Sequence, residues 1–163
     1  VQYAYDKGIM KGVGNYRFAP NEPLTRAQIA QILYAQAGSP AVSGEMKFTD
    51  VAQGSWYYNA VLWASQNGIV TGYANGMFRP NTNITREQLA RMLYAHAGTP
   101  AVSGDLNNFA DGAKVSNWAK DAVIWAKEKG IIKGKTVNGK LCIDPQGNAT
   151  RAEAATMMKN YLG

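Results

Sequence analysis

The sequence predicts an all-α fold that is built from three copies of one helix-loop-helix unit. One dipeptide occurs three times along the 163 residues, as Thr25-Arg26, Thr85-Arg86 and Thr150-Arg151. A short apolar block between two glycines also occurs three times, at 8–12, 68–72 and 130–134. Because both blocks keep their order along the whole chain, they define sequence repeats. The repeats run over residues 1–44, 45–104 and 105–163, and together they are expected to form one folded module.

Each repeat is predicted to begin with a short helix. The pattern is clearest over 56–67, where Trp56, Val61 and Ala64 follow helical spacing. The matching helices are expected over 1–7 and 118–129. A glycine then ends each helix, and Asn-Gly pairs at 75–76 and 138–139 predict tight turns. Gly14-Asn15 is a looser copy of this turn signal.

The second helix of each repeat is predicted to start at the recurring threonine. The pattern Thr-x-x-Gln/Glu is a capping box, in which the threonine hydroxyl and the Gln or Glu side chain satisfy backbone N–H groups at the helix start. It is found at Thr25 with Gln28, Thr85 with Gln88, and Thr150 with Glu153. Gly38, Gly98 and Gly163 stand where a helix-ending glycine is expected.

The arginine beside each threonine is not explained by helix capping. It lies at the positive end of the helix dipole, where a cation gains nothing. One interpretation is a solvated or locally paired side chain, for example Arg26 with Glu22. The other is an anion site, because free N–H groups and a guanidinium fork suit a carboxylate or phosphate. The residues alone leave both interpretations open.

Composition narrows the possible partners. The formal net charge of +6 favours anionic polymers or surfaces. No apolar run approaches the ~20 residues that a membrane-spanning helix needs, so no membrane insertion is expected. Cys142 and His96 are each the only residue of their type, and no cluster with ligand spacing indicates a metal or cofactor site.

The chain resembles the S-layer homology family, as a tandem of three such domains. The resemblance covers essentially the whole chain and is carried by an ordered set of motifs. These are Phe48-x-Asp50-Val51, Trp56-Tyr57, Gly68-Ile69-Val70-x-Gly72-Tyr73, Asn75-Gly76-x-Phe78-Arg79-Pro80, Ile84-Thr85-Arg86-Glu87-Gln88 and the hallmark Thr-Arg-Ala-Glu at 150–153. The resemblance implies a pseudo-threefold arrangement of the repeats around a central three-helix bundle. It further implies a module that holds a larger exported protein on the bacterial cell surface, or in the S-layer, by binding an anionic secondary cell-wall polysaccharide. In many members that polysaccharide carries pyruvate ketals.

The resemblance also implies a set of ligand-binding residues in grooves between repeats. These are Arg26, Arg86 and Arg151, with Gly12, Gly72 and Gly134, and with Trp56 and Trp118 as candidates for the groove wall. The arginines are expected to bind ligand and to contribute little to folding. The segment that would precede Val1 and match Phe48 to Trp56 is expected to belong to a longer protein. Because the first repeat lacks this segment and the third departs from the motifs, one or two functional grooves are expected instead of three.

Other functions remain open from the sequence alone. A wall-active enzyme would need a catalytic group, but the acids are scattered and no carboxylate pair stands out, so no catalytic residue is predicted. A nucleic-acid binder is disfavoured because the arginines are spread one to a repeat. A purely structural module that joins subunits, or an accessory domain of a wall enzyme, is the alternative to the anchor.

Overall fold

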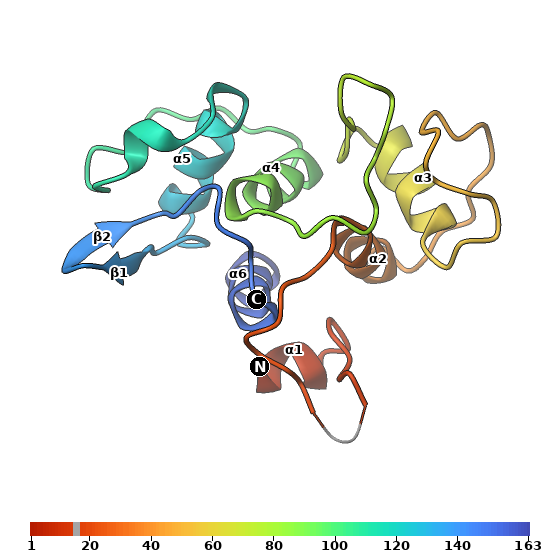
Figure 1. Ribbon diagram of the computed structural model, residues 1–163, viewed down its shortest axis with the longest axis horizontal. Coiled ribbons are helices and arrows are strands. Elements are labelled where there is room, and N and C mark those ends of the chain that lie inside the picture. Colours follow the sequence, from red (N-terminus) through yellow and green to blue (C-terminus); the bar gives the residue numbers. More distant parts are fainter. Residues whose placement is uncertain (15–16) are drawn as a thin grey trace.

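The computed structural model describes residues 1–14 and 17–163, and these residues are mainly helical. The expected Gly14-Asn15 turn reaches residue 15 and therefore lies outside the described residues. The α-helices in chain order are α1 (Gln2–Asp6), α2 (Arg26–Gln36), α3 (Tyr58–Gln66), α4 (Arg86–His96), α5 (Lys120–Glu128) and α6 (Arg151–Leu162). Two 3-10 turns, η1 (Gly112–Lys114) and η2 (Asn117–Ala119), precede α5. Figure 1 shows these elements with α2, α4 and α6 in its middle part.

The all-α prediction needs one correction, a short β-hairpin in the third repeat. Strand β1 (Lys135–Val137) pairs antiparallel with β2 (Lys140–Cys142). Their connection is the predicted Asn138-Gly139 turn, and both residues have positive φ angles, 50° and 74°. Such a turn matches the twist of the two strands, which explains why pairing follows it.

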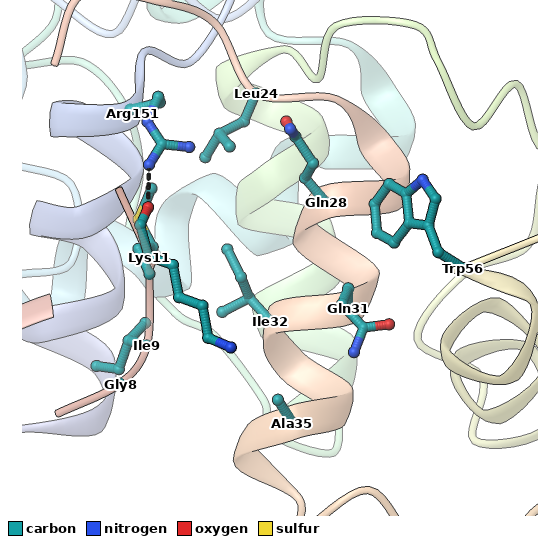
Figure 2. Close-up of a pocket in the computed structure, with 11 residues that line it drawn as sticks. Gly8, Ile9, Lys11, Leu24, Gln28, Gln31, Ile32, Ala35, Trp56 and Arg151 are labelled. Atoms are coloured by element: carbon teal, nitrogen blue, oxygen red, sulfur yellow. Dashed lines mark hydrogen bonds between the residues drawn. The ribbon is translucent and has the colours of Figure 1, made fainter. Parts of the chain in front are cut away.

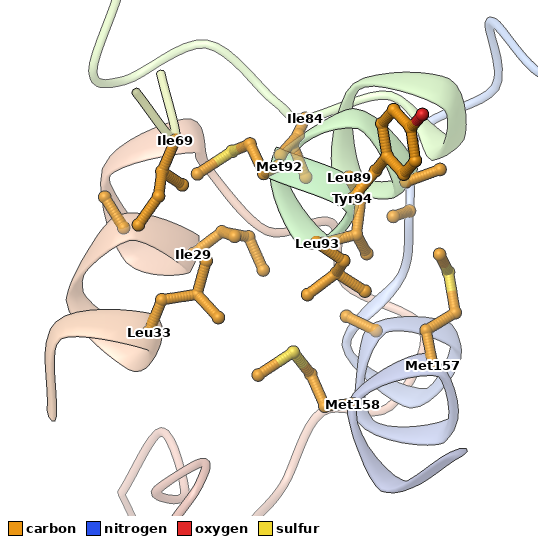
Figure 3. Close-up of a cluster of buried hydrophobic side chains, with 14 of the residues drawn as sticks. Ile29, Leu33, Ile69, Ile84, Leu89, Met92, Leu93, Tyr94, Met157 and Met158 are labelled. Carbon is orange, nitrogen blue, oxygen red and sulfur yellow. The ribbon is translucent and has the colours of Figure 1, made fainter. Parts of the chain in front are cut away.

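Helices α2, α4 and α6 begin where the repeated threonine predicted, and they share one core. Leu33, Leu93 and Met158 each have 0% of their surface exposed. Figure 3 shows side chains of these three helices pointing toward a common space, with Ile29 and Leu89 beside them. Burying a large aliphatic side chain stabilises a fold by about 1.5–3 kcal/mol, so this shared core is a main source of stability.

The first helix of each repeat packs against a neighbouring repeat. Helix α3 of the second repeat packs on α2 of the first, and α5 of the third packs on α4 of the second. Helix α1 of the first repeat packs on α6 of the third, which closes the series (Figure 1). A sequence repeat is therefore not a packing unit, because the main helix–helix contacts join two repeats.

Three backbone hydrogen bonds connect the segments just before α2, α4 and α6. The N–H of Leu24 donates to the carbonyl of Ala149 (3.2 Å), that of Ala149 to Ile84 (2.9 Å), and that of Ile84 to Leu24 (2.8 Å). All three side chains are buried. The starts of the three second helices are thus tied together directly, and the arginines that follow them are brought close to the neighbouring repeats.

Candidate ligand-binding grooves

The three predicted capping boxes are present. The N–H groups of Gln28, Gln88 and Glu153 donate to the threonine hydroxyls at 3.2, 3.3 and 3.2 Å. The Gln and Glu side chains in turn accept from the threonine N–H groups at 2.9, 3.1 and 2.9 Å. These reciprocal bonds fix the first turn of each helix and hence the position of the adjacent arginine.

Each of these arginines reaches into the next repeat along the closed series. The Nε of Arg26 donates to the carbonyl of Phe78 (2.8 Å) in the second repeat. Arg86 donates from Nε to Ile143 (2.7 Å) in the third repeat, and Arg151 donates to Phe18 (2.7 Å) in the first.

The interpretation of solvated arginines is wrong, because only 7%, 6% and 7% of Arg26, Arg86 and Arg151 is exposed. Burial lowers the pKa of the Arg26 and Arg151 guanidinium groups from their ordinary value, yet an arginine stays charged in proteins. Glu22 opposes that shift at Arg151, so it lies near Arg151 and not, as suggested from the sequence, paired with Arg26. Buried cations that donate to backbone carbonyls also do not fit the expectation of little contribution to folding.

Arg151 lines a cavity of about 370 Å³ together with Trp56, and we call this cavity the Trp56 groove. Its parts come from all three repeats: Arg151 from the third, Trp56 from the second, and Lys11 and the face of α2 from the first. In Figure 2, Trp56 lies on one side of α2 and Arg151 on the other, with Gln28 of α2 between them. Trp56 is 61% exposed, so it offers a free aromatic surface in the same cavity as the two cations Lys11 and Arg151.

Arg26 lines a second cavity, of about 600 Å³, with Trp118, and we call it the Trp118 groove. It is built like the Trp56 groove, but each part comes from the next repeat along the closed series. Arg26 comes from the first repeat, Trp118 from the third, and Gly72, Tyr73 and the face of α4 from the second. The Arg26 guanidinium lies 4.9 Å from the centroid of the Tyr73 ring. Trp118 is 55% exposed.

Arg86, the third of these arginines, has a protein partner. Its Nη1 lies 3.0 Å from Oε1 of Glu153, the hallmark glutamate of the third repeat. Lys135 adds a second cation to the same carboxylate oxygen at 3.6 Å. Glu153 therefore gives Arg86 a carboxylate from the protein itself. A ligand with a carboxylate would present the same chemical group to Arg26 or Arg151.

The three glycines predicted for the grooves have different surroundings. Gly72 lines the Trp118 groove, whereas Gly12 lines a separate cavity beside α1, with Tyr5 and Phe18. Gly134 lies under the ring of Phe109, where an added Cβ would come within 2.7 Å of Cε1. Gly72 and Gly134 both have positive φ, so backbone geometry and ring packing account for them without a ligand.

Asp50 and Asp111 each bind a loop that lies later in the same repeat. The Asp50 carboxylate accepts from the N–H groups of Phe78 and Arg79, each at 2.7 Å. Asp111 accepts in the same way from Ile143 and Asp144, also at 2.7 Å. Each aspartate thus holds the loop whose carbonyl receives an arginine, and it acts on the groove indirectly.

Two cations of the grooves were not predicted from the sequence. Lys11 lines the Trp56 groove and Arg91 lines the Trp118 groove. Lys11 lies inside the repeated block at 8–12 and recurs as Lys133, although Thr71 stands at this position in the second repeat. Arg91 is matched by the uncharged Gln31 in the first repeat. Helical spacing offered one signal for Arg91, because it follows Gln88 by three residues and so shares its face of α4.

Comparison with known proteins agrees with this repeat architecture. The sequence profile of the S-layer homology domain matches residues 1–30, 47–90 and 108–155. The chain belongs to the S-layer homology domain family. This confirms the resemblance found in the sequence, including its three tandem repeats.

Relatives of this S-layer homology chain are far longer proteins. The Surface-layer 125 kDa protein of Lysinibacillus sphaericus is 35% identical over 99% of this chain and 14% of its own length. The amylopullulanase of Thermoanaerobacterium thermosulfurigenes is 30% identical over 99% of this chain and 9% of its own length. The cellulosome-anchoring protein of Acetivibrio thermocellus is 26% identical over 94% of this chain and 35% of its own length. The chain thus spans a minor part of each.

The family and the surface-layer relative indicate a location at the cell surface, as expected from the sequence. Among residues 1–14 and 17–163, no helix has the length and apolar character needed to cross a membrane. The same residues contain no group of three or more His, Cys, Asp or Glu side chains placed to hold a metal ion.

Proposed function

We propose that this S-layer homology module anchors a larger exported protein to an anionic polysaccharide of the bacterial cell wall and has no catalytic role of its own. The observation that carries the proposal is the pairing of a buried arginine with an exposed tryptophan in one cavity. The pairing occurs twice, as Arg151 with Trp56 and as Arg26 with Trp118.

The chemistry of the two grooves suits a sugar that bears a carboxylate, such as a pyruvate ketal. A guanidinium whose Nε is held by a backbone carbonyl keeps its remaining N–H donors in a fixed direction, and two of them match a carboxylate. Apolar and aromatic walls with few polar groups are typical of ligand sites. An exposed tryptophan beside the cation provides a flat surface for the apolar face of a sugar ring.

We infer that two grooves bind, not three. Arg86 already has a carboxylate partner in Glu153, and a polysaccharide would have to displace it. In the Trp56 and Trp118 grooves the matching positions are Gln28 and Gln88, which are uncharged. Their oxygens serve the capping boxes and leave Arg151 and Arg26 without a competing negative charge from that position.

We also propose that the three repeats form one module with pseudo-threefold symmetry around α2, α4 and α6. Support comes from the closed series of helix contacts and from the three backbone hydrogen bonds among Leu24, Ile84 and Ala149. The equivalent hydrogen bonds that the three arginine Nε atoms donate to the next repeat, at 2.7–2.8 Å, also support this arrangement.

The relatives favour attachment over the alternatives. One relative is named as a cellulosome-anchoring protein, and another is an enzyme of which the matched part is only 9%. A module that accompanies such different proteins suits a common role in surface attachment, and an accessory domain of an enzyme would use the same grooves. A module that only joins subunits gives no reason for cations and exposed tryptophans to share two cavities.

A binding assay with two forms of one polymer tests this proposal. Wall polysaccharide that carries pyruvate ketals is purified, and half of it is treated with mild acid to remove them. The chain should sediment with the untreated polymer and should lose most of this binding with the treated polymer. A neutral glucan serves as a control for non-specific binding to polysaccharide. Equal binding to both forms, or binding to neither, would show that the anion is not what the grooves recognise.

A further inference from the structure

Arg91 has an unusual environment in the Trp118 groove. It lines this groove with Arg26, and its Nη1 is buried without a hydrogen-bond partner among the described residues. Most buried polar groups in native proteins are hydrogen-bonded, so an unpaired guanidinium nitrogen needs an explanation. A group that binds in the groove would provide one.

The position of Arg91 is specific to one groove. Gln88 and Arg91 lie three residues apart on α4 and both line the Trp118 groove, just as Gln28 and Gln31 of α2 line the Trp56 groove. The side chain at this position is thus a cation in one groove and a neutral amide in the other. Among the described residues, no acid lines the Trp118 groove. The Asp50 carboxylate opposes the lowering of the Arg26 pKa by burial, but its two oxygens accept from backbone N–H groups.

We propose that Arg91 forms a second anion subsite in the Trp118 groove, which takes the carboxylate of a neighbouring sugar on the same polysaccharide chain. This inference rests on the proposed function, in which Arg26 holds the first carboxylate. A polysaccharide whose repeating unit bears a carboxylate presents these groups at regular intervals. Two guanidinium groups in one cavity can therefore hold two successive carboxylates.

The Arg91 subsite gives the two grooves different ligand preferences. The Trp56 groove presents Lys11 from the loop side and Gln31 from the helix side, whereas the Trp118 groove presents Thr71 and Arg91 there. An ammonium is a point charge, but a guanidinium binds a carboxylate through two directed N–H groups. The Trp118 groove therefore selects for two regularly spaced carboxylates.

The test uses two synthetic disaccharides that differ only in the number of pyruvate ketals, one or two. The Trp56→Ala variant of the chain is used so that the Trp118 groove is observed alone. It should bind the doubly modified disaccharide about tenfold more tightly than the singly modified one, as expected for one added charge-assisted hydrogen-bonded contact. Adding Arg91→Gln, which copies Gln31, should bring the two affinities to within about twofold without lowering the melting temperature. Arg91→Lys should keep part of the preference.

The outcomes separate this inference from the proposed function. If the Trp56→Ala chain binds the singly modified disaccharide and Arg91→Gln leaves the preference for the second ketal unchanged, the subsite is overturned and the anchor stands. If the Trp56→Ala chain binds neither disaccharide, both are overturned. If Arg91→Gln removes the preference but also unfolds the chain, the loss reflects the fold, and the subsite is overturned unless Arg91→Lys is folded and keeps the preference.

Discussion

Arg86 and Glu153 form an ion pair across two repeats, with 3.0 Å between Nη1 and Oε1. Both residues lie in the first turn of a helix, Arg86 in α4 and Glu153 in α6. The same glutamate accepts from the N–H of Thr150 through its other oxygen, Oε2. One side chain thus caps its own helix and holds the neighbouring repeat.

The change Glu153→Gln separates these two roles. Glutamine can still accept from the Thr150 N–H, so the helix start should remain, but the charge that faces Arg86 is lost. Because Arg86 is buried and Glu153 is 26% exposed, we expect the free energy of unfolding to fall by about 1–2 kcal/mol. Urea denaturation measures this. Lys135→Gln removes more exposed contacts, the 2.6 Å pair with Asp144 and the 3.6 Å contact with Glu153, and should cost no more than about 0.5 kcal/mol. A Glu153→Gln protein as stable as the wild type would show that the pair contributes nothing.

Arg151 is expected to stabilise the fold in addition to binding ligand. Its guanidinium donates from Nε to Phe18 and from Nη2 to Lys11, so it joins the third repeat to the first. Arg151→Gln should lower stability by about 2–3 kcal/mol, because two hydrogen bonds of a charged donor to part-buried carbonyls are lost. Arg79→Gln, at an exposed arginine, is the matched control and should stay within about 0.5 kcal/mol. Equal melting curves for wild type and Arg151→Gln would contradict the structural role.

The helix starts were predictable because their chemistry is local. Thr25 and Gln28 are only three residues apart, and the capping box needs no other part of the chain. The destination of each arginine was not predictable in this way. Arg151 meets Phe18, and Arg26 meets Phe78, across separations that only the closed packing of the repeats creates.

The residues of the site could be predicted from the sequence only where they recur in the repeats. Trp56 and Trp118 recur and proved to be exposed beside an arginine, while Trp63 and Trp125 recur and proved to be buried. Exposure depends on the neighbouring repeat, so only the family resemblance, and not the recurrence itself, set Trp56 and Trp118 apart as groove candidates. Arg91 was not predicted because an arginine stands at this position in one repeat alone, so the other repeats do not point to it.

His96 should make stability depend on pH. Its ring lies near Trp63 and Tyr161, and its Nδ1 is 2.7 Å from the Tyr161 hydroxyl. Burial lowers the pKa of His96 below its ordinary value of 6.5. The unfolded chain then binds more protons than the folded chain between the lowered pKa and 6.5, so stability should fall as the pH decreases through this window.

The histidine contribution is isolated by comparing wild type with His96→Gln, which copies Gln36 of the first repeat. Thermal melts at several pH values between about 7 and 5 should show a smaller loss of stability for the variant. Parallel curves for the two proteins would mean that His96 has the same pKa in the folded and unfolded chains.

A single repeat should not fold by itself. In the fragment 48–98, helix α3 loses α2, and α4 loses α5, which are their packing partners. The buried side chains Val61 and Leu93 would then face water, and their burial is worth about 1.5–3 kcal/mol each. Circular dichroism of the fragment should show little helix and no cooperative melt. A sharp, reversible transition would contradict the shared core.

The most direct test of the account is polymer binding by three tryptophan variants, Trp56→Ala, Trp118→Ala and the double variant. Both side chains are more than half exposed, so all three proteins should melt within a few degrees of the wild type. Either single change should weaken apparent affinity for the ketal-bearing wall polysaccharide, because binding through two grooves on one polymer is lost. The double variant should no longer bind. A folded double variant that binds the polysaccharide as tightly as the wild type would contradict the claim that these grooves anchor the protein.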